Sequence, residues 1–457
     1  MHRLFQNTII KENKMKSQKS ILKLVSAIIT LAVFLTACAS ATTPVADHAT
    51  QQPAANGSTA TEAPAQSPAS IAKVTVTYWH SMSNPETEQF NKVIAAFEAA
   101  NPDITIESTR YASDDNSFQN AMVTAMSSKT FPDAARMDIA WVSQYAADGV
   151  LMPLDGQMSD FNAISKAVFP GPLSTNFYQG HYYGLPLDTN TQVLLWNKQV
   201  FQAAGINEPP KTLTEFADVA CKLSDKNKEI YGYAQGGTYF WASAPIFYAM
   251  GGKIVDDKQT TATGYINGPQ SVAAFTMLKS LYDKGCMSPN LLGGGIATDA
   301  GHGEGKYAMI IDGPWMVDKY KSMYPDFQTN FALIPTGPDG TTSSVVGGED
   351  VVIFNSAKNK EATMKWLSYL MSPDAQRIMA EVGIMPTLAG LQNDPALPPY
   401  FGIFMEQLKT AQARVPHPKW SQMDDAINQA YQRILLGEQP VQASLDQAAE
   451  EINALLK

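Results

Sequence analysis

The spacing of apolar residues along the chain predicts strands that alternate with helices. Residues 73–79 alternate polar and apolar side chains at every second position, which is typical of a half-buried strand. Apolar residues between 90 and 97 then recur at helical spacing, and we expect this helix to begin with Asn84 as its N-cap and Pro85 in its first turn. The same order repeats from Ile104 onward. Alternating strands and helices indicate an α/β fold with a parallel sheet.

Later parts of the chain continue this alternation. A capping box at 212–215 predicts the start of one helix, and 270–284 form another amphipathic helix. Gly184 and Pro186 predict a break in the chain before a strand at 193–196. Four further helices are expected near the C-terminus, at 361–371, 373–381, 422–436 and 441–456.

The stretch 304–315 joins a short apolar strand to an abrupt stop. Residues 307–311 are apolar apart from the tyrosine hydroxyl, Asp312-Gly313-Pro314 interrupts the strand, and Trp315 follows at once. Ligands of open α/β sheets bind outside the carboxyl ends of the strands. Trp315 is therefore a candidate ligand contact, with a core tryptophan at a turn as the alternative.

Composition and charge limit the function classes. A chain of 457 residues exceeds one ordinary core, so we expect two lobes or domains. The formal net charge of −10 argues against nucleic acid as a partner, because such proteins show basic patches. The sequence contains no His-Glu-x-x-His helix, no Gly-x-Ser-x-Gly elbow and no zinc-spaced Cys or His cluster.

Several stretches resemble bacterial extracellular solute-binding proteins of family 1, the maltose-binding type that serves ABC importers. Residues 305–315 match the pattern Gly-x-x-Ala-Met-x-x-x-Gly-Pro-Trp of that family. Its N-lobe is similar to the stretches YWHSMSNPETEQFNKVIAAFEAANPDITIE and FPDAARMDIAWVSQYAADGVLMPLD. In that family the chain crosses three times from one lobe to the other. The stretches that resemble these crossings are YYGLPLDTNTQVLLWNK, IPTGPDGTTSSVVGGEDVVIF and GIMPT. The resemblance covers roughly 71–457, although His302 stands near a place where the family usually has an aromatic residue.

This resemblance implies a two-lobed periplasmic-binding-protein-like fold of the class II type. Each lobe would be a mostly parallel sheet flanked by helices, with three crossings joining the lobes. The N-lobe would hold 71–187 with 336–386, and the C-lobe 188–335 with 387–457.

The implied function is binding and not catalysis, without a cofactor or a metal. The protein would be a monomer that captures a di- or oligosaccharide between its lobes and delivers it to ABC permease subunits by hinge closure. One alternative is a protein of the same fold that binds glycerol-3-phosphate or glycerophosphodiesters, which 78–82 also resemble. An extracellular glycosidase and a sensor partner of a membrane kinase are further alternatives.

A sugar site needs flat rings for the apolar faces of a pyranose and polar groups for its hydroxyls. Trp196 and Trp366 lie within a predicted strand and a predicted helix, so we expect them in the core. The resemblance gives ligand-facing roles to Trp241 and Trp315. The candidate ligand-binding residues, each of which has a solvated loop, a cap or the core as its alternative, are Trp79, His80, Asp138, Trp141, Asp188, Asn190, Trp241, Trp315, Gly348, Glu349, Asp350 and Arg414.

The N-terminus has the pattern of an export signal. Lysines at 16–23 precede the apolar stretch 24–35, and Leu-Thr-Ala-Cys then resembles a bacterial lipobox that ends at Cys38. We expect 1–37 to be a lipoprotein signal peptide and Cys38 to be lipidated on the outer face of the cytoplasmic membrane. A transmembrane anchor is the alternative, but the apolar stretch is shorter than the roughly 20 residues that span a bilayer. Residues 38–70 are rich in Ala, Thr, Pro and Ser, which indicates a flexible tether.

Two cysteines remain besides Cys38. Disulfides persist outside the cytosol, so Cys221 and Cys286 are candidates for a bridge, with two free thiols as the alternative.

Overall fold

The computed structural model describes residues 73–112, 117–327 and 329–457 of the chain. The predicted signal peptide, the predicted lipidation site Cys38 and the predicted tether lie outside the described residues. In the part of the chain that is described, no helix is long and apolar enough to cross a membrane.

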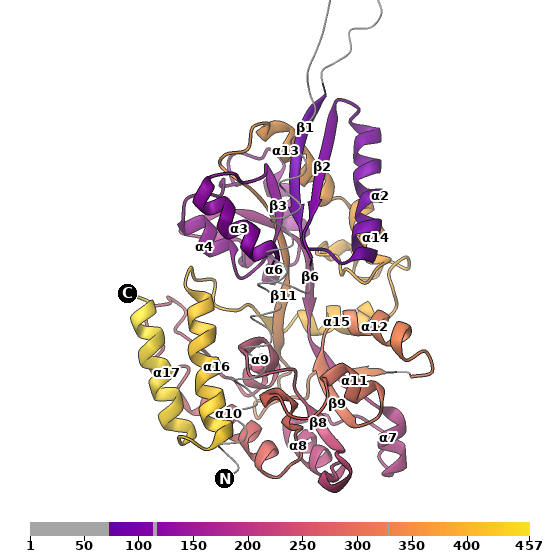
Figure 1. Cartoon of the computed structure of the whole chain (residues 1–457), viewed down its shortest axis with the longest axis vertical. Coiled ribbons are helices and arrows are strands. Elements are labelled where there is room, and N and C mark those ends of the chain that lie inside the picture. Colours follow the sequence, from indigo (N-terminus) through magenta and orange to yellow (C-terminus); the bar gives the residue numbers. More distant parts are fainter. Residues whose placement is uncertain (1–72, 113–116, 328) are drawn as a thin grey trace, which may run out of the picture. The chain divides into compact units, whose positions relative to one another are not determined.

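A six-stranded sheet forms the first half of the fold (Figure 1). Its strands are β1 (Val74–His80), β2 (Ile104–Arg110), β3 (Ala134–Asp138), β6 (Gly184–Thr191), β11 (Ser344–Ile353) and β12 (Ala411–Gln412). The order is β12-β11-β3-β1-β2, and β6 also pairs with β11. Strand β1 runs parallel to β2 and β3, whereas β11 runs antiparallel to β3 and β6.

Aromatic packing holds two helices on this sheet. Helices α2 (Asn84–Ala100) and α13 (Lys360–Leu370) meet around Trp366, which is completely buried, and α14 (Pro373–Ala380) packs on α2. The Trp366 ring lies 4.9 Å from the ring of Phe97 in α2 and 6.0 Å from the ring of Tyr78 in β1. The N-cap of α2 is Ser83, one residue before the predicted Asn84, because the Glu86 carboxylate accepts a hydrogen bond from the Ser83 N–H group (2.7 Å).

A four-stranded sheet forms the second half, in the order β10-β7-β9-β8. Its strands are β7 (Val193–Trp196), β8 (Tyr231–Ala234), β9 (Tyr307–Asp312) and β10 (Asn330–Ala332). Only β8 and β9 are parallel, since β7 pairs antiparallel with β9 and β10. The expectation of a mostly parallel sheet is therefore wrong here, because β7 enters from the neighbouring sheet and runs against β9.

Helices pack around this second sheet. They include α8 (Leu213–Lys222), α9 (Phe240–Ala249), α10 (Pro269–Asp283), α16 (Trp420–Leu436) and α17 (Val441–Leu455). A disulfide joins Cys221 in α8 to Cys286 after α10. The Thr212 hydroxyl accepts a hydrogen bond from the Glu215 N–H group (3.1 Å), so the predicted capping box starts α8.

The remaining elements are short and lie between the larger ones. The helices are α3 (Ser117–Ser128), α4 (Val142–Ala147), α5 (Phe161–Ala167), α6 (Pro170–Ser174), α7 (Lys198–Ala203), α11 (Thr298–Gly303), α12 (Trp315–Met323) and α15 (Phe401–Leu408). A two-stranded hairpin pairs β4 (Phe177–Tyr178) with β5 (His181–Tyr182), and short 3-10 helices cover Lys226–Lys228, Pro289–Leu292 and Ala389–Leu391.

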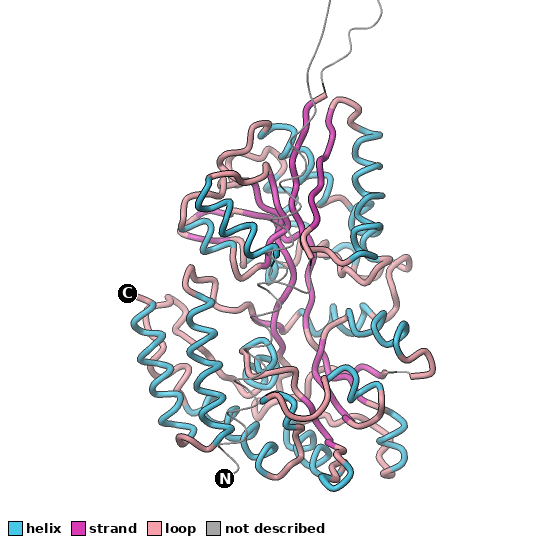
Figure 2. Tube along the Cα trace, viewed as in Figure 1, coloured by secondary structure: helices cyan, strands magenta, loops and turns pink. Residues whose placement is uncertain are grey.

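Strand β6 leads directly from the first sheet to the second. Figure 2 shows β6 and β11 as long neighbouring strands, and a single residue, Gln192, separates β6 from β7. The predicted break at Gly184 and Pro186 is therefore wrong. Pro186 fits inside β6 because the register shifts between Glu349 and Asp350 on β11, and a shifted ladder tolerates a missing N–H donor.

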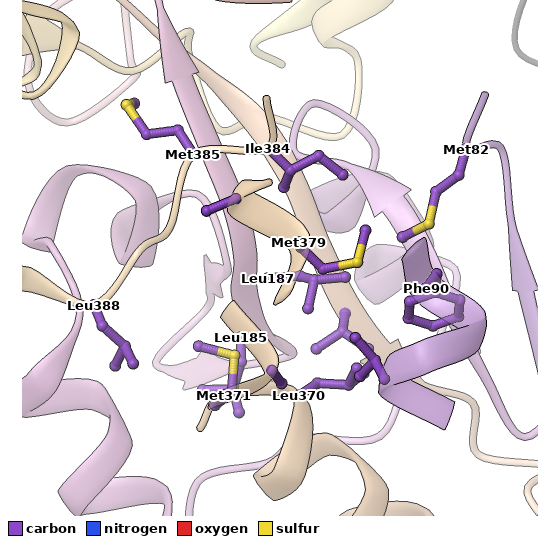
Figure 3. Packing of buried hydrophobic residues seen from close by; sticks show 14 of the residues in the cluster. Met82, Phe90, Leu185, Leu187, Leu370, Met371, Met379, Ile384, Met385 and Leu388 are labelled. Carbon is purple, nitrogen blue, oxygen red and sulfur yellow. The ribbon is translucent and has the colours of Figure 1, made fainter. Parts of the chain in front are cut away.

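An apolar cluster packs the predicted third crossing, residues 383–387, against β6. Figure 3 shows Leu187 of β6 among apolar side chains that include Phe90 of α2, Leu370 of α13, Met379 of α14 and Ile384 of the segment after α14. The cluster encloses a cavity of about 20 Å³. Beside it, the Thr189 N–H group donates to the Met385 carbonyl (3.1 Å), and the Thr387 hydroxyl donates to the Pro186 carbonyl (2.7 Å).

His302 lies in the glycine-rich segment before β9, within the short helix α11. Its side chain is completely buried, and its ring nitrogens contact the Tyr307 carbonyl (2.9 Å) and the Thr329 hydroxyl (3.2 Å). A carbonyl only accepts, so Nδ1 carries the proton, and Nε2 of the neutral ring accepts from Thr329. Burial lowers the pKa of His302 to about 4.

His302 should make the protein less stable in mild acid. The unfolded chain binds a proton at this position below pH 6.5, and the folded chain does so only below about pH 4. Stability from this group is therefore present at neutral pH and is lost as the pH falls. We expect His302→Gln to remove about 2 kcal/mol from the difference in unfolding free energy between pH 7 and pH 5. Urea unfolding of wild type and of His302→Gln at pH 7 and pH 5 checks this. If the unfolding free energy changes equally with pH in the two proteins, the prediction is contradicted.

Candidate ligand-binding site

Three strands of the first sheet bring carboxylates together beside the second sheet. Glu349 on β11 pairs with Asp138 on β3 and with Asp188 on β6. Side chains of directly paired residues share one face of a sheet, so the three carboxylates do too. We call the group that includes them the polar cluster; its members are Arg136, Asp138, Asp188, Asn190, Trp241, Gly347, Glu349 and Arg414.

Arg136 joins two strands at the base of the polar cluster. Its Nε lies 3.0 Å from Asp188 Oδ2 on β6, and its Nη2 lies 2.8 Å from Glu349 Oε2 on β11. The arginine side chain is 7% exposed. Burial raises the pKa of the Glu349 carboxyl, and the charge of Arg136 opposes that shift. Arg136 therefore bridges the two carboxylates and holds them in fixed positions.

Arg414 spans the two sheets at the other side of the cluster. Its Nη2 lies 3.3 Å from Asp138 Oδ1, and its guanidinium carbon lies 5.4 Å from the centre of the Trp241 ring. Such stacking of a cation on an indole is favourable. The Arg414 Nε is buried and has no hydrogen-bond partner among the described residues. The contact therefore links β3 of the first sheet to α9, which packs on the second.

Two glycines of β11 lie close to Trp241 and to β6. A Cβ atom on Gly347 would lie 2.2 Å from Asn190 Oδ1 and 2.4 Å from Trp241 Cη2. Gly348 has a φ of +125°, and a Cβ there would meet the Asp188 carbonyl at 2.4 Å. The Gln192 side chain donates to the Trp241 carbonyl (2.7 Å), which fixes the start of α9 against β6.

Trp315 borders a separate groove of about 380 Å³ on the second sheet, which we call the Trp315 groove. Its walls include the glycines at 293–295, Asp312 and an ion pair between Asp299 and Lys319. The Trp315 side chain opens α12 and is 42% exposed. Burial raises the pKa of Asp312 to about 6, opposed by hydrogen bonds from the Gly313 N–H group (2.8 Å) and the Trp315 side chain.

Four consecutive residues connect the groove with the polar cluster. Asn190 lies in the cluster, Gln192 holds Trp241, and Val193 pairs with Asp312 at the groove. The structure thus brings together seven predicted site residues, while Trp315 lies in the adjoining groove. The seven are Asp138, Asp188, Asn190, Trp241, Gly348, Glu349 and Arg414.

Two predicted aromatic contacts lie elsewhere. Trp79 packs against Tyr111 with ring centres 5.2 Å apart and lines another surface groove with Thr75 and Thr77. The Trp141 ring stacks on Phe118 with ring centres 6.1 Å apart. Both rings therefore cover an apolar cluster of the first half and are used in packing.

Two predicted polar contacts are buried. His80 is 1% exposed, its Nδ1 accepts from the Met82 N–H group (3.2 Å), and burial lowers its pKa to about 4. Asp350 is completely buried and accepts hydrogen bonds from Asn176 (2.7 Å) and Thr175 (3.1 Å). Successive side chains of a strand point to opposite faces, so Asp350 faces the core when Glu349 faces the cluster.

Sequence reasoning missed Arg136, Gln192, Asp312 and Gly347 as parts of this site. The signal for Arg136 was present, since a lone arginine between apolar residues of a short strand needs buried partners. The positions of Gln192 and Gly347 depend on which strands pair, and the sequence does not show this.

The arrangement suits an uncharged ligand rich in hydroxyl groups. Carboxylates accept hydrogen bonds, guanidinium groups donate them, and Asn190 does both. Indole rings beside these groups offer apolar surface. Across the described ranges, no group of three or more His, Cys, Asp or Glu side chains is placed to hold a metal ion.

Comparison with known proteins identifies relatives of the whole folded part. Residues 83–377 match the family described as bacterial extracellular solute-binding protein. An ABC transporter solute-binding protein of Thermotoga lettingae, solved with α-D-tagatose bound, is 30% identical with a TM-score of 0.73, covering 84% of this chain and 100% of that one. The maltotriose-binding protein of Pyrococcus abyssi is 26% identical, covering 82% of this chain and 81% of its own length.

A third relative is named for a different ligand. The sn-glycerol-3-phosphate-binding periplasmic protein of Escherichia coli is 24% identical, covering 66% of this chain and 72% of its own length. The structural similarity confirms the predicted α/β fold of the periplasmic-binding type.

Proposed function

Because the chain belongs to the bacterial extracellular solute-binding protein family, we propose that it captures a neutral sugar for an ABC importer. The members of this family are solute-binding proteins, so the chain is a binding protein and not an enzyme. The observation that supports a sugar best is the polar cluster, where Arg414 lies between the Asp138 carboxylate and the Trp241 ring. Relatives named for maltotriose and solved with tagatose add to this support.

We propose that the ligand is a di- or oligosaccharide. The segment 190–193 leads along the chain from the polar cluster to the strand that pairs with Asp312 at the Trp315 groove, and neighbouring sugar units would occupy these two places. Trp315 would stack on one unit, and Asn190, Glu349 and Asp138 would bind hydroxyl groups of the other.

The charges favour a neutral ligand over glycerol-3-phosphate, the alternative of the same fold. The cluster carries the carboxylates of Asp138, Asp188 and Glu349 against the two guanidinium groups of Arg136 and Arg414. Arg136 already has two carboxylate partners, and Arg414 has one. A phosphate near Arg414 would lie beside the Asp138 carboxylate and would be repelled by it.

The two long strands suit a hinge. We propose an N-lobe of 71–187 with 336–386 and a C-lobe of 188–335 with 387–457, which bend relative to one another near 186–190, 334–336 and 384–388. A ligand that contacts both lobes binds the closed state more tightly and so favours closure. The closed form of a monomer would then dock on the permease subunits.

We propose that lipidation of Cys38 anchors the protein on the outer face of the cytoplasmic membrane, with 38–70 as its tether. The prediction is that Cys38→Ser moves the protein from the membrane fraction of its native host to the soluble fraction, because the acyl chains are lost. Fractionation and immunoblotting measure this. Retention of the variant in the membrane fraction would show another anchor.

A thermal-shift screen of the purified protein tests the sugar proposal. The panel contains mono-, di- and oligosaccharides, glycerol-3-phosphate and glycerophosphodiesters. A ligand at 100 times its dissociation constant adds about 2.7 kcal/mol to the free energy of unfolding, which is a clear rise in Tm. We expect a rise with a neutral saccharide. A rise with the phosphate compounds alone would overturn the sugar proposal in favour of the alternative.

A further inference from the structure

We infer that Gly313 and Gly347 are positioning residues that fix the indole rings of Trp315 and Trp241 for sugar recognition. The inference rests on the proposed function and adds two residues to it. Neither glycine offers a side chain to a ligand, so each acts through the tryptophan that lies against it.

Both glycines lie where a methyl group would meet the tip of a tryptophan ring. A Cβ atom on Gly313 would lie 2.2 Å from Cη2 and 2.3 Å from Cζ3 of Trp315. On Gly347 it would lie 2.4 Å from Cη2 of Trp241. Carbon atoms attract best at about 3.5–4.0 Å, so an alanine at either position would push the ring away by about 1 Å or more.

The requirement for glycine at these positions is one of space and not of backbone conformation. Neither Gly313 nor Gly347 is among the glycines with positive φ. Alanine is therefore compatible with the backbone at both positions. Gly348 differs, because its φ of +125° favours glycine whatever the space around it.

The group displaced at Gly313 is a partly exposed ring. Trp315 is 42% exposed, and its ring can rotate into solvent about the side-chain bonds, which gives up its hydrogen bond to Asp312 but little core packing. Gly313→Ala should thus change the direction of the ring without unfolding the protein. The groove would keep its volume and lose the flat surface in its original orientation.

At Gly347 a methyl group would disturb three members of the polar cluster. Besides the Trp241 ring, it would meet Asn190 Oδ1 at 2.2 Å. That oxygen is buried and has no hydrogen-bond partner within the part of the chain that is described. Arg414 rests on the same indole at 5.4 Å, so a shift of the ring also shifts the guanidinium group. We therefore expect a larger loss of affinity for Gly347→Ala than for Gly313→Ala.

The experiment compares Gly313→Ala and Gly347→Ala with Gly390→Ala in the otherwise unchanged protein. Gly390 is a matched control, because its φ is not positive and a Cβ there meets no described atom within 4 Å. Isothermal titration with the saccharide found by the thermal-shift screen gives the dissociation constant. Near-ultraviolet circular dichroism of the unliganded proteins reports the tryptophan environment, and thermal unfolding gives the Tm.

We expect at least tenfold weaker binding for both variants, an altered near-ultraviolet spectrum and, for Gly313→Ala, a Tm within about 2 °C of wild type. Gly390→Ala should match wild type in all three. Because Gly313 acts through Trp315, adding Gly313→Ala to Trp315→Ala should change the dissociation constant by less than twofold. This double variant separates positioning from a general structural effect.

The outcomes distinguish this inference from the proposed function. Wild-type affinity in Gly313→Ala, or a further tenfold loss when it is added to Trp315→Ala, would overturn the positioning role while leaving sugar binding intact. If Gly347→Ala does not fold, the test rests on Gly313→Ala alone and on Gly313→Ala combined with Trp315→Ala. If wild type binds no saccharide, the proposed function fails and this role fails with it.

Discussion

Trp315→Ala should weaken binding of the saccharide about tenfold to a hundredfold and leave the Tm nearly unchanged. The ring is 42% exposed, so its removal costs little core packing, and its hydrogen bond to Asp312 is lost with it. Stacking of a sugar on this ring would bury one large apolar side chain, which is worth roughly 1.5–3 kcal/mol. Isothermal titration of the variant against wild type measures the loss.

Phe177→Ala is the matched control for Trp315→Ala. Phe177 is 43% exposed and lies in the hairpin of β4 and β5, where it packs on Tyr182. We expect it to bind the saccharide as wild type does. Equal affinities of Trp315→Ala and wild type would show that Trp315 is not a binding surface, and the Trp315 groove would then lose its proposed role.

Arg136→Met should destabilise the protein by about 3 kcal/mol, because it leaves the buried Asp188 carboxylate and the Glu349 carboxylate, which is 26% exposed, without a cation. Arg136 contacts Asp188 at 3.0 Å and Glu349 at 2.8 Å, and the arginine and Asp188 side chains are 7% and 6% exposed. Urea unfolding gives the free energy directly.

Two controls make the Arg136 result specific. Arg414→Met removes a cation whose carboxylate partner is 41% exposed, so a loss below about 1 kcal/mol is expected. Adding Asp188→Asn and Glu349→Gln to Arg136→Met should recover part of the stability, since the unpaired charges disappear. A loss below 1 kcal/mol for Arg136→Met alone would contradict the role of this arginine.

Periodicity of apolar residues predicted most of the elements. The alternation at 73–79 gave β1 within one residue of its bounds, and the capping box at Thr212 gave the start of α8. The errors arose where tertiary pairing overrides local signals. Pro186 usually interrupts a strand, but β6 continues through it because the register on β11 shifts there.

The candidate site was harder to predict, because its members come from distant parts of the chain. Asp138 and Arg414 are 276 residues apart and meet only after both sheets have formed. Glu349 and Asp350 look equivalent in the sequence, and only the face of β11 decides which of them reaches the polar cluster. His80 and Trp141 stand near strand ends, as ligand contacts do, but His80 is buried beside Phe90 and the partly buried Trp141 ring packs on Phe118.

Calorimetric titration of the unmodified protein with neutral oligosaccharides and with glycerol-3-phosphate, in the same buffer, tests the central claim most directly. We predict one-site binding of a neutral di- or oligosaccharide and no heat of binding with glycerol-3-phosphate. Tighter binding of glycerol-3-phosphate than of every saccharide would contradict the claim that the polar cluster recognises an uncharged ligand.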